Sequence, residues 1–288
     1  MSEAPRPSRR EKQALLSPDS GEFLYSVTAR KPSAVSHAVR ARFTGIRDKN
    51  LLVARCNYLT VYTMTQTGFV EVEEMNMYAA IINLVVIPLP KPRSVTSSSS
   101  NSTVYADRIL VVKENSHRSI TMLSFQNGRI VVEETENVSK PRRGVSECLC
   151  KYHEGSQLVG LHNSHGVIKF FRVNRDGSLK NFSRQREQTL EEINIEDFEF
   201  FYAPQYGVKG LCVSFLHYTH SGTMFLTSHP VKDLSHVISS IPINHAARHL
   251  VALPLKISGF LVLGGSSISF IDPIKPMNCK MKPVPDML

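Results

Sequence analysis

Apolar and polar residues alternate in short runs along most of this chain, and one arrangement of two such runs recurs. In residues 51–64, LLVARCNYLTVYTM, an apolar run is followed by a break at Asn57 and then by a second, alternating run. Alternation with a period of two is typical of a half-buried strand. The stretch therefore predicts a β-hairpin.

Four later stretches repeat this arrangement of strand, polar break and strand. They read ILVVKENSHRSITMLSF from residue 109, LVGLHNSHGVIKFFRV from 158, LCVSFLHYTHSGTMFLTS from 211 and LVLGGSSISFID from 261. Successive copies start about 50 residues apart, and a supersecondary unit that returns at such a period indicates a repeat architecture.

Each repeat contains more than one hairpin. TGFVEVEE (67–74) and AAIINLVVI (79–87) fill the interval between the first two copies, and GRIVVEETE (128–136) follows the second. Units of four strands and about 50 residues predict the blades of a β-propeller, with a β-sandwich as the alternative. The only candidate helix is RQREQTLEEI (184–193). The predicted fold class is all-β, with four-stranded antiparallel blades.

The five hairpins predict about five blades, whereas a seven-bladed ring would need about 350 residues. We therefore expect a partial propeller, about five blades of a seven-bladed design. Residues 1–22 predict a disordered basic tail, 23–272 the incomplete first propeller domain, and 273–288 a poorly ordered segment with four prolines and no strand pattern. The serine-rich stretch 90–107 has no apolar period and predicts a flexible insertion.

Composition limits the class of protein. A hydrophobic content of 42% is ordinary for a globular domain, and no apolar run approaches the roughly 20 residues of a membrane span. The polar N-terminus lacks the apolar core of a signal peptide, and five sparse cysteines do not suggest a disulfide framework. We expect an intracellular protein without a membrane partner.

The formal charge of +9 is compatible with nucleic-acid binding. The basic residues are scattered, however, apart from the tail and one loop, and no platform of interleaved aromatic residues accompanies them. The tail and loop residues are Arg6, Arg9, Arg10 and Lys12, and Lys140, Arg142 and Arg143. A solvated basic surface is favoured over a nucleic-acid groove.

Two pairs of histidines resemble metal ligands at first sight. His162 and His165 lie in HNSH, and His217 and His220 lie in HYTH. Both pairs fall at predicted hairpin turns, where polar side chains satisfy free backbone groups, and no further ligand has zinc spacing. We therefore predict turn residues, with no metal and no cofactor.

Cys148 and Cys150, with His153 nearby, do not make a catalytic site by proximity alone. A nucleophile needs a placed base and an oxyanion site. On a strand the two cysteines share a face, which suits packing into a sheet.

GGSS (264–267) lacks the lysine and helix of a phosphate loop and predicts a tight turn.

An acidic cluster precedes and enters a predicted strand. Its carboxylates alternate with apolar residues, so we predict the exposed face of a strand rather than a hydrolytic or metal site. The cluster comprises Glu191, Glu192, Glu196, Asp197 and Glu199. With no catalytic constellation in the sequence, we predict no enzyme activity, no small-molecule substrate and no catalytic, cofactor or metal residues.

Several stretches resemble one known family. YSVTARKPSAV (25–35), NLLVARCNYLTVYTM (50–64), LVGLHNSHGVIKFFRVNRDGSLKNF (158–182) and LVALPLKISGFLVLGGSSISFID (250–272) are similar to the first propeller of the large subunits of the UV-damaged-DNA-binding, splicing and cleavage-polyadenylation complexes. The VTARKPSAV stretch favours the damage-binding branch. The resemblance covers residues 25–272.

The resemblance implies a non-catalytic scaffold in a cullin-four ubiquitin ligase adaptor that acts in UV-damage recognition and nucleotide excision repair. The implied partners are cullin-four ligase components and substrate receptors. The implied compartment is the nucleus, with the cytoplasm as a second location. The alternative is a nucleic-acid-binding subunit of a pre-mRNA splicing or 3′-end cleavage factor. The basic tail, the serine-rich insertion and the end after about five blades depart from the family pattern. No partner-contact residue is assigned.

Overall fold

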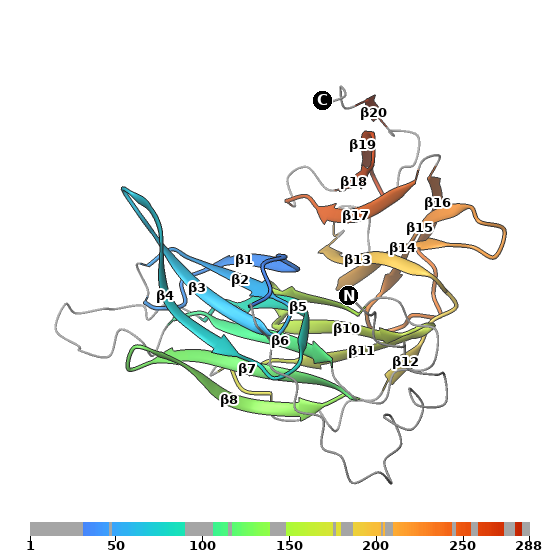
Figure 1. Ribbon diagram of the computed structural model, residues 1–288. Coiled ribbons are helices and arrows are strands. Elements are labelled where there is room, and N and C mark those ends of the chain that lie inside the picture. Colours follow the sequence, from blue (N-terminus) through green and yellow to red (C-terminus); the bar gives the residue numbers. More distant parts are fainter. Residues whose placement is uncertain are drawn as a thin grey trace, which may run out of the picture. The chain divides into compact units, whose positions relative to one another are not determined.

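Five four-stranded antiparallel sheets account for the strands that are described, and each sheet consists of strands that follow one another in sequence (Figure 1). The computed structural model describes residues 31–45, 48–89, 106–114, 117–138, 148–174, 177–179, 187–202, 204, 210–243, 246–254, 259–273 and 280–283. The chain divides into two units, residues 1–33 and 34–288, and all five sheets belong to the second.

The sheets, here called blades 1 to 5, share one simple topology in which each strand pairs with the next along the chain. Blade 1 contains β1 (His37–Ala41), β2 (Asn50–Arg55), β3 (Tyr58–Thr65) and β4 (Gly68–Asn76); blade 2 contains β5 (Ala80–Ile87), β6 (Arg108–Glu114), β7 (Arg118–Gln126) and β8 (Arg129–Asn137). Blade 3 contains β9 (Leu149–His153), β10 (Leu158–Ser164), β11 (Val167–Arg172) and β12 (Glu187–Thr189), with the 3-10 turn η3 (Glu154–Ser156) between β9 and β10. Blade 4 contains β13 (Ile195–Tyr202), β14 (Leu211–Tyr218), β15 (Met224–Pro230) and β16 (Ser239–Ile243); blade 5 contains β17 (Ala247–Ala252), β18 (Phe260–Gly264), β19 (Ser267–Ile271) and β20 (Lys280–Pro283).

The five predicted hairpins are confirmed as the two central strands of the five blades. They are β2–β3, β6–β7, β10–β11, β14–β15 and β18–β19. The GGSS stretch is the turn between β18 and β19, as predicted. Between β7 and β8, Asn127 (φ 52°) and Gly128 (φ 80°) form a two-residue connection of the kind that matches the right-handed twist of paired strands.

Apolar side chains fill the space between consecutive blades. One buried cluster joins blades 1 and 2, a second joins blades 2 and 3, a third joins blades 3 and 4, and a fourth joins blades 4 and 5. Because successive strand residues point to opposite faces, the central strands of blades 2, 3 and 4 contribute to two of these clusters. This explains why these strands appear as nearly continuous apolar runs in the sequence.

The first strands of the blades lie next to one another in chain order: β1 contacts β5, β5 contacts β9, β9 contacts β13, and β13 contacts β17. Sheets that pack face to face and meet at their first strands form a β-propeller. The predicted fold class of four-stranded antiparallel blades is thus confirmed, and the described residues contain five of them.

Two predictions about local structure were wrong. Within 184–193, predicted as the candidate helix, residues 187–189 form the short strand β12, which pairs with β11. Within 273–288, where no strand was expected, β20 pairs with β19. The predicted basic tail and residues 90–105 of the serine-rich insertion lie outside the described residues, as do 274–279 and 284–288.

Candidate functional site

A cavity of about 950 Å³ lies where the first strands of all five blades converge. Most of its lining is polar or charged, and oppositely charged side chains are present together. The lining residues are Ser36, His37, Ile81, Ile82, Asn83, Leu84, Glu114, Arg118, Cys148, Leu149, Cys150, Lys151, Glu196, Asp197, Tyr218, Ala246, Arg248 and His249. This cavity corresponds to the central channel of a propeller, where these folds place binding or catalytic groups when they have them.

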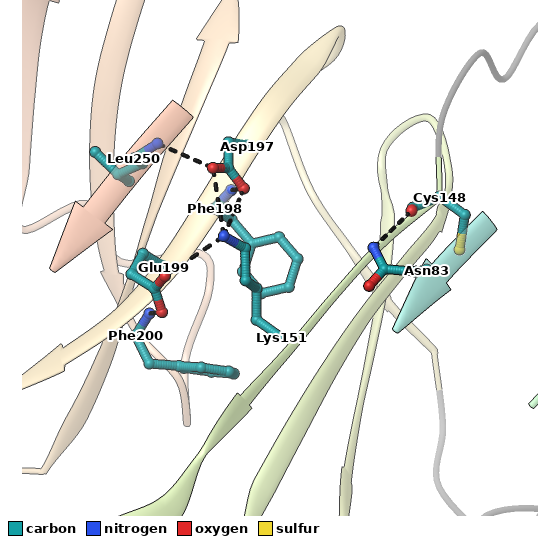
Figure 2. Close-up of polar contacts among 8 residues, drawn as sticks. All are labelled: Asn83, Cys148, Lys151, Asp197, Phe198, Glu199, Phe200 and Leu250. Atoms are coloured by element: carbon teal, nitrogen blue, oxygen red, sulfur yellow. Dashed lines mark hydrogen bonds and ion pairs between the residues drawn. The ribbon is translucent and has the colours of Figure 1, made fainter. Parts of the chain in front are cut away.

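Lys151 on β9 forms the main ionic contact of this region with two carboxylates on β13 (Figure 2). Its Nζ atom lies 3.1 Å from Asp197 Oδ1 and 3.5 Å from Glu199 Oε2. Burial of Lys151 disfavours its charge, but the two carboxylates outweigh that effect and raise its pKa. A lysine held in the charged form is neither a nucleophile nor a general base.

Asp197 extends this contact to the next blade. Its Oδ2 atom accepts a hydrogen bond of 2.9 Å from the backbone N–H of Leu250 on β17, and its Oδ1 atom accepts one from the N–H of Phe198 (Figure 2). Glu199 accepts from the N–H of Phe200. Asp197 therefore connects blades 3, 4 and 5 through one buried carboxylate.

The acidic cluster is consequently not the exposed strand face that the sequence predicted. Asp197 is buried, Glu196 and Glu199 are half-buried, and Glu191 is exposed. Glu192 is also buried and lies 2.7 Å from His229 Nε2 on β15. Burial opposes the charge of the Glu192 carboxylate, but the hydrogen bond and charge of His229 lower its pKa overall. The buried members of the cluster, Asp197 and Glu192, make ion-pair and hydrogen-bond contacts inside the protein instead of facing solvent.

Polar links also cross the earlier blade boundaries. Arg42, which follows β1, donates through its backbone N–H and its guanidinium to Asp107, which precedes β6. Arg118 on β7 is only 3% exposed, and its Nη1 atom donates to the backbone carbonyl (2.9 Å) and the side-chain oxygen (3.1 Å) of Asn163 on β10.

The amide of Asn83 adds a weaker hydrogen bond of 3.4 Å to the carbonyl of Cys148, also between blades 2 and 3 (Figure 2). No motif in the sequence indicates a structural role for Arg42, Arg118 or Asn83. Their partners lie 45 or more residues away along the chain, so no local pattern distinguishes them from exposed polar residues.

The two histidine pairs are separated by the structure. His165 and His220 lie in turns, as predicted, but His162 lies in β10 and His217 in β14, and both are buried. Burial lowers the pKa of both rings, that of His162 to about 4. His217 shares a hydrogen bond of 2.9 Å with Thr227. Among the residues that the structure describes, no group of three or more His, Cys, Asp or Glu side chains has an arrangement that could hold a metal ion.

Cys148 and Cys150 are buried in the apolar cluster between blades 2 and 3, which confirms their predicted common face. Burial raises the pKa of the Cys148 thiol to about 12 and that of Cys150 well above its usual value. The thiolate is the reactive form of cysteine. Both side chains therefore serve in packing. His153 instead caps η3 through Ser156.

Comparison with known proteins identifies the family. The family described as RSE1/DDB1/CPSF1 first beta-propeller matches residues 34–286. The chain belongs to this family. The resemblance inferred from the strand sequences is thereby confirmed, and the five blades are those of a first-propeller domain of this type.

Curated relatives support the same relationship. DNA damage-binding protein 1 from Oryza sativa subsp. japonica is 23% identical over 255 residues, which cover 85% of this chain and 22% of the relative. DNA damage-binding protein 1 from Caenorhabditis elegans is 22% identical, and its alignment covers 89% of this chain and 22% of the relative. DNA damage-binding protein 1a from Arabidopsis thaliana is 23% identical, and its alignment covers 85% of this chain and 22% of the relative. The chain thus spans about a fifth of the length of these relatives.

No helix in the described part is long and apolar enough to cross a membrane.

Proposed function

We propose that this chain is a non-catalytic scaffold that supplies rigid sheet edges and loops to protein partners. The observation that carries the proposal is the family match across residues 34–286, which coincides with five regular blades. The chemistry of the channel agrees with this function: its lysine is held charged by carboxylates, and its cysteines are buried with raised pKa values.

We further propose the partners and process implied by the family resemblance. These are cullin-four ubiquitin ligase components and substrate receptors, in UV-damage recognition and nucleotide excision repair in the nucleus. Support comes from the relatives named DNA damage-binding protein 1, each of which aligns with most of this chain. At 22–23% identity, the partner-contact residues of the relatives are not transferred to this chain.

Affinity purification from nuclear extract tests the scaffold function. The bait is the full chain, and the control is an unrelated β-propeller of matched positive charge, which removes partners retained by charge alone. We expect cullin-four components or substrate receptors to be enriched on the full chain at physiological salt and to remain bound at higher salt. Recovery of no ligase subunit and no receptor above the control would contradict the proposal.

The net charge of +9 favours one alternative, a nucleic-acid-binding subunit of a splicing or 3′-end cleavage factor. Contacts between basic residues and phosphates weaken steeply as salt is added. Fluorescence anisotropy with damaged duplex DNA, undamaged duplex DNA and single-stranded RNA, at low and at physiological salt, distinguishes the two. Binding that persists at physiological salt would support the alternative, and its absence would exclude it.

A further inference from the structure

The fourth strand of blade 1 has an outer edge with which no described strand pairs (Figure 1). β4 pairs with β3 along one edge, and the backbone N–H and C=O groups of its other edge point to the perimeter of the blade. No described strand pairs with the outer edges of blades 2, 3 and 4 either, although each of these has a described blade on both sides. The open edge is therefore a property of the blade topology and not of the number of blades.

β4 differs from the other outer strands in its exposed apolar side chains. Phe69, Val70 and Val72 are 60%, 49% and 37% exposed, whereas no other described strand has more than one exposed large apolar side chain. The outer strand β12 is short, and β16 and β20 each contain a proline, which cannot donate a hydrogen bond to a further strand. A long edge strand with exposed apolar side chains and no proline is the kind that accepts another strand.

Two unpaired carboxylates lie among these apolar side chains. Glu71 is exposed and Glu73 is half-buried, and neither forms an ion pair or a side-chain hydrogen bond with any residue that the structure describes. The register with β3 puts Glu71 on one face of the strand together with Phe69, and Glu73 on the other face together with Val70. An added strand therefore meets one apolar and one acidic position on each face.

The charges determine which kind of chain fits this edge. A second copy of β4, paired antiparallel and centred on Val72, would place Glu71 of each copy opposite Glu73 of the other. Directly opposed like charges destabilise a pair of strands. The phosphates of a nucleic acid would meet the same repulsion. A polypeptide with lysine or arginine opposite the two glutamates forms cross-strand ion pairs instead.

We propose that the outer edge of β4 binds an extended segment of a partner protein, which adds to blade 1 as a fifth strand. The segment carries basic residues opposite Glu71 and Glu73 and apolar residues opposite Phe69 and Val70. Main-chain hydrogen bonds provide the affinity, and the alternating side chains provide the selectivity. This inference rests on the scaffold function proposed above, and it names an edge and a class of partner segment for that function.

Fluorescence anisotropy of a labelled peptide, Thr-Lys-Val-Lys-Val-Val-Thr, tests the proposal on the full chain. In an antiparallel strand that begins opposite Glu74, the lysines of this basic peptide are opposite Glu73 and Glu71, and its last two valines are opposite Val70 and Phe69. We expect saturable binding that weakens as salt rises from about 0.05 to about 0.5 M, because the ion pairs are exposed to solvent. An acidic peptide with glutamate in place of both lysines should bind at least about tenfold more weakly.

Charge reversal at both glutamates, Glu71→Lys with Glu73→Lys, should weaken binding of the basic peptide at least about tenfold. The matched control is Glu154→Lys with Glu191→Lys, which changes the net charge equally at two exposed glutamates outside blade 1 and should leave binding unchanged. Circular dichroism establishes that each variant is folded. If the Glu71 and Glu73 lysine variant is not folded, Glu71→Gln with Glu73→Gln replaces it.

The absence of saturable binding of the basic peptide up to about 1 mM would overturn the proposal. So would equal binding to the wild-type chain and to the variant at Glu71 and Glu73. A basic peptide whose alternate backbone amides are N-methylated keeps its charges but cannot pair as a strand, so equal binding of this peptide would also overturn it. If the affinity purification still recovers ligase subunits or receptors in any of these cases, the scaffold function stands and only the β4 edge is excluded.

Discussion

Replacement of Asp197 by alanine tests the idea that polar groups at the channel hold consecutive blades together. The buried Asp197 carboxylate contacts Lys151 at 3.1 Å, the N–H of Leu250 at 2.9 Å and the N–H of Phe198 at 2.9 Å. Alanine removes all three contacts and leaves the Leu250 N–H, in a buried region, without its acceptor. The change therefore acts on blades 3, 4 and 5 at once.

The size of the effect follows from the environment of each contact. A hydrogen bond to a charged group contributes about 1.5–3 kcal/mol, and breaking a buried ion pair costs about 3–5 kcal/mol. The side chain of Lys151 is 30% exposed, so solvent screens the ion pair and reduces its share. We expect Asp197→Ala to lower the free energy of unfolding by about 3–4 kcal/mol. Asp197→Asn keeps one acceptor and should cost about half as much.

Urea unfolding followed by circular dichroism measures this difference. Glu196→Ala is the matched control, because Glu196 is the adjacent residue, lines the same cavity and is half-buried. It should change the unfolding free energy by less than about 0.5 kcal/mol. If Asp197→Ala costs less than about 1 kcal/mol, or if Glu196→Ala costs as much, Asp197 does not connect the blades in the way the contacts indicate.

Three further predictions concern other buried positions. The depressed pKa of His162, about 4 against 6.5 unfolded, means that its stabilising contribution is complete above pH 6.5 and is lost as pH falls towards 4. His162→Leu should therefore remove about 2 kcal/mol of the pH dependence of the unfolding free energy between pH 7.5 and pH 5, and an unchanged dependence over this range would contradict the prediction. In the native protein at pH 7.5, a thiol reagent should label exposed Cys56 and spare buried Cys148, whose pKa is raised to about 12, as peptide mapping can verify. A Cβ added at Gly160 would lie 2.9 Å from a ring carbon of Phe198 in blade 4, so Gly160→Ala should lower the free energy of unfolding in urea by about 2 kcal/mol. The control Gly265→Ala, where an added Cβ meets no atom within 4 Å, should be nearly neutral, and equal effects of the two substitutions would refute the prediction.

Local patterning predicted the strands well because each hairpin is encoded by adjacent residues. Period-two alternation and polar turns located the central hairpin of every blade and both neighbouring strands of the first interval. The helix candidate failed for a related reason: glutamates and glutamines spaced around Leu190 suit a helix, but pairing of residues 187–189 with β11 determines the structure there. Tertiary pairing overrides weak local propensity in so short a segment.

The channel and the boundaries between blades were less predictable from the sequence. Alternation predicts that Asp197 and Ile195 lie on the same strand. It does not predict whether the Asp197 side chain contacts water or a neighbouring blade. Lys151, the partner of Asp197, lies 46 residues earlier in the chain, so only the packing of blade 3 on blade 4 brings the two charges together. The same long separation conceals Arg42 and Asp107.

These polar links explain how blades with similar apolar faces pack in a defined position. Burial of apolar surface is non-directional, so two aliphatic sheet faces alone tolerate sliding and rotation. A hydrogen bond weakens steeply when its distance or angle changes. Each described blade boundary has at least one such link: Arg42 to Asp107 between blades 1 and 2, the Arg118 contact between blades 2 and 3, and Asp197 to Lys151 and to Leu250 at the two later boundaries. The apolar clusters supply most of the stability, and the polar links fix the relative register of the blades, which a scaffold needs in order to present its loops to partners in constant positions.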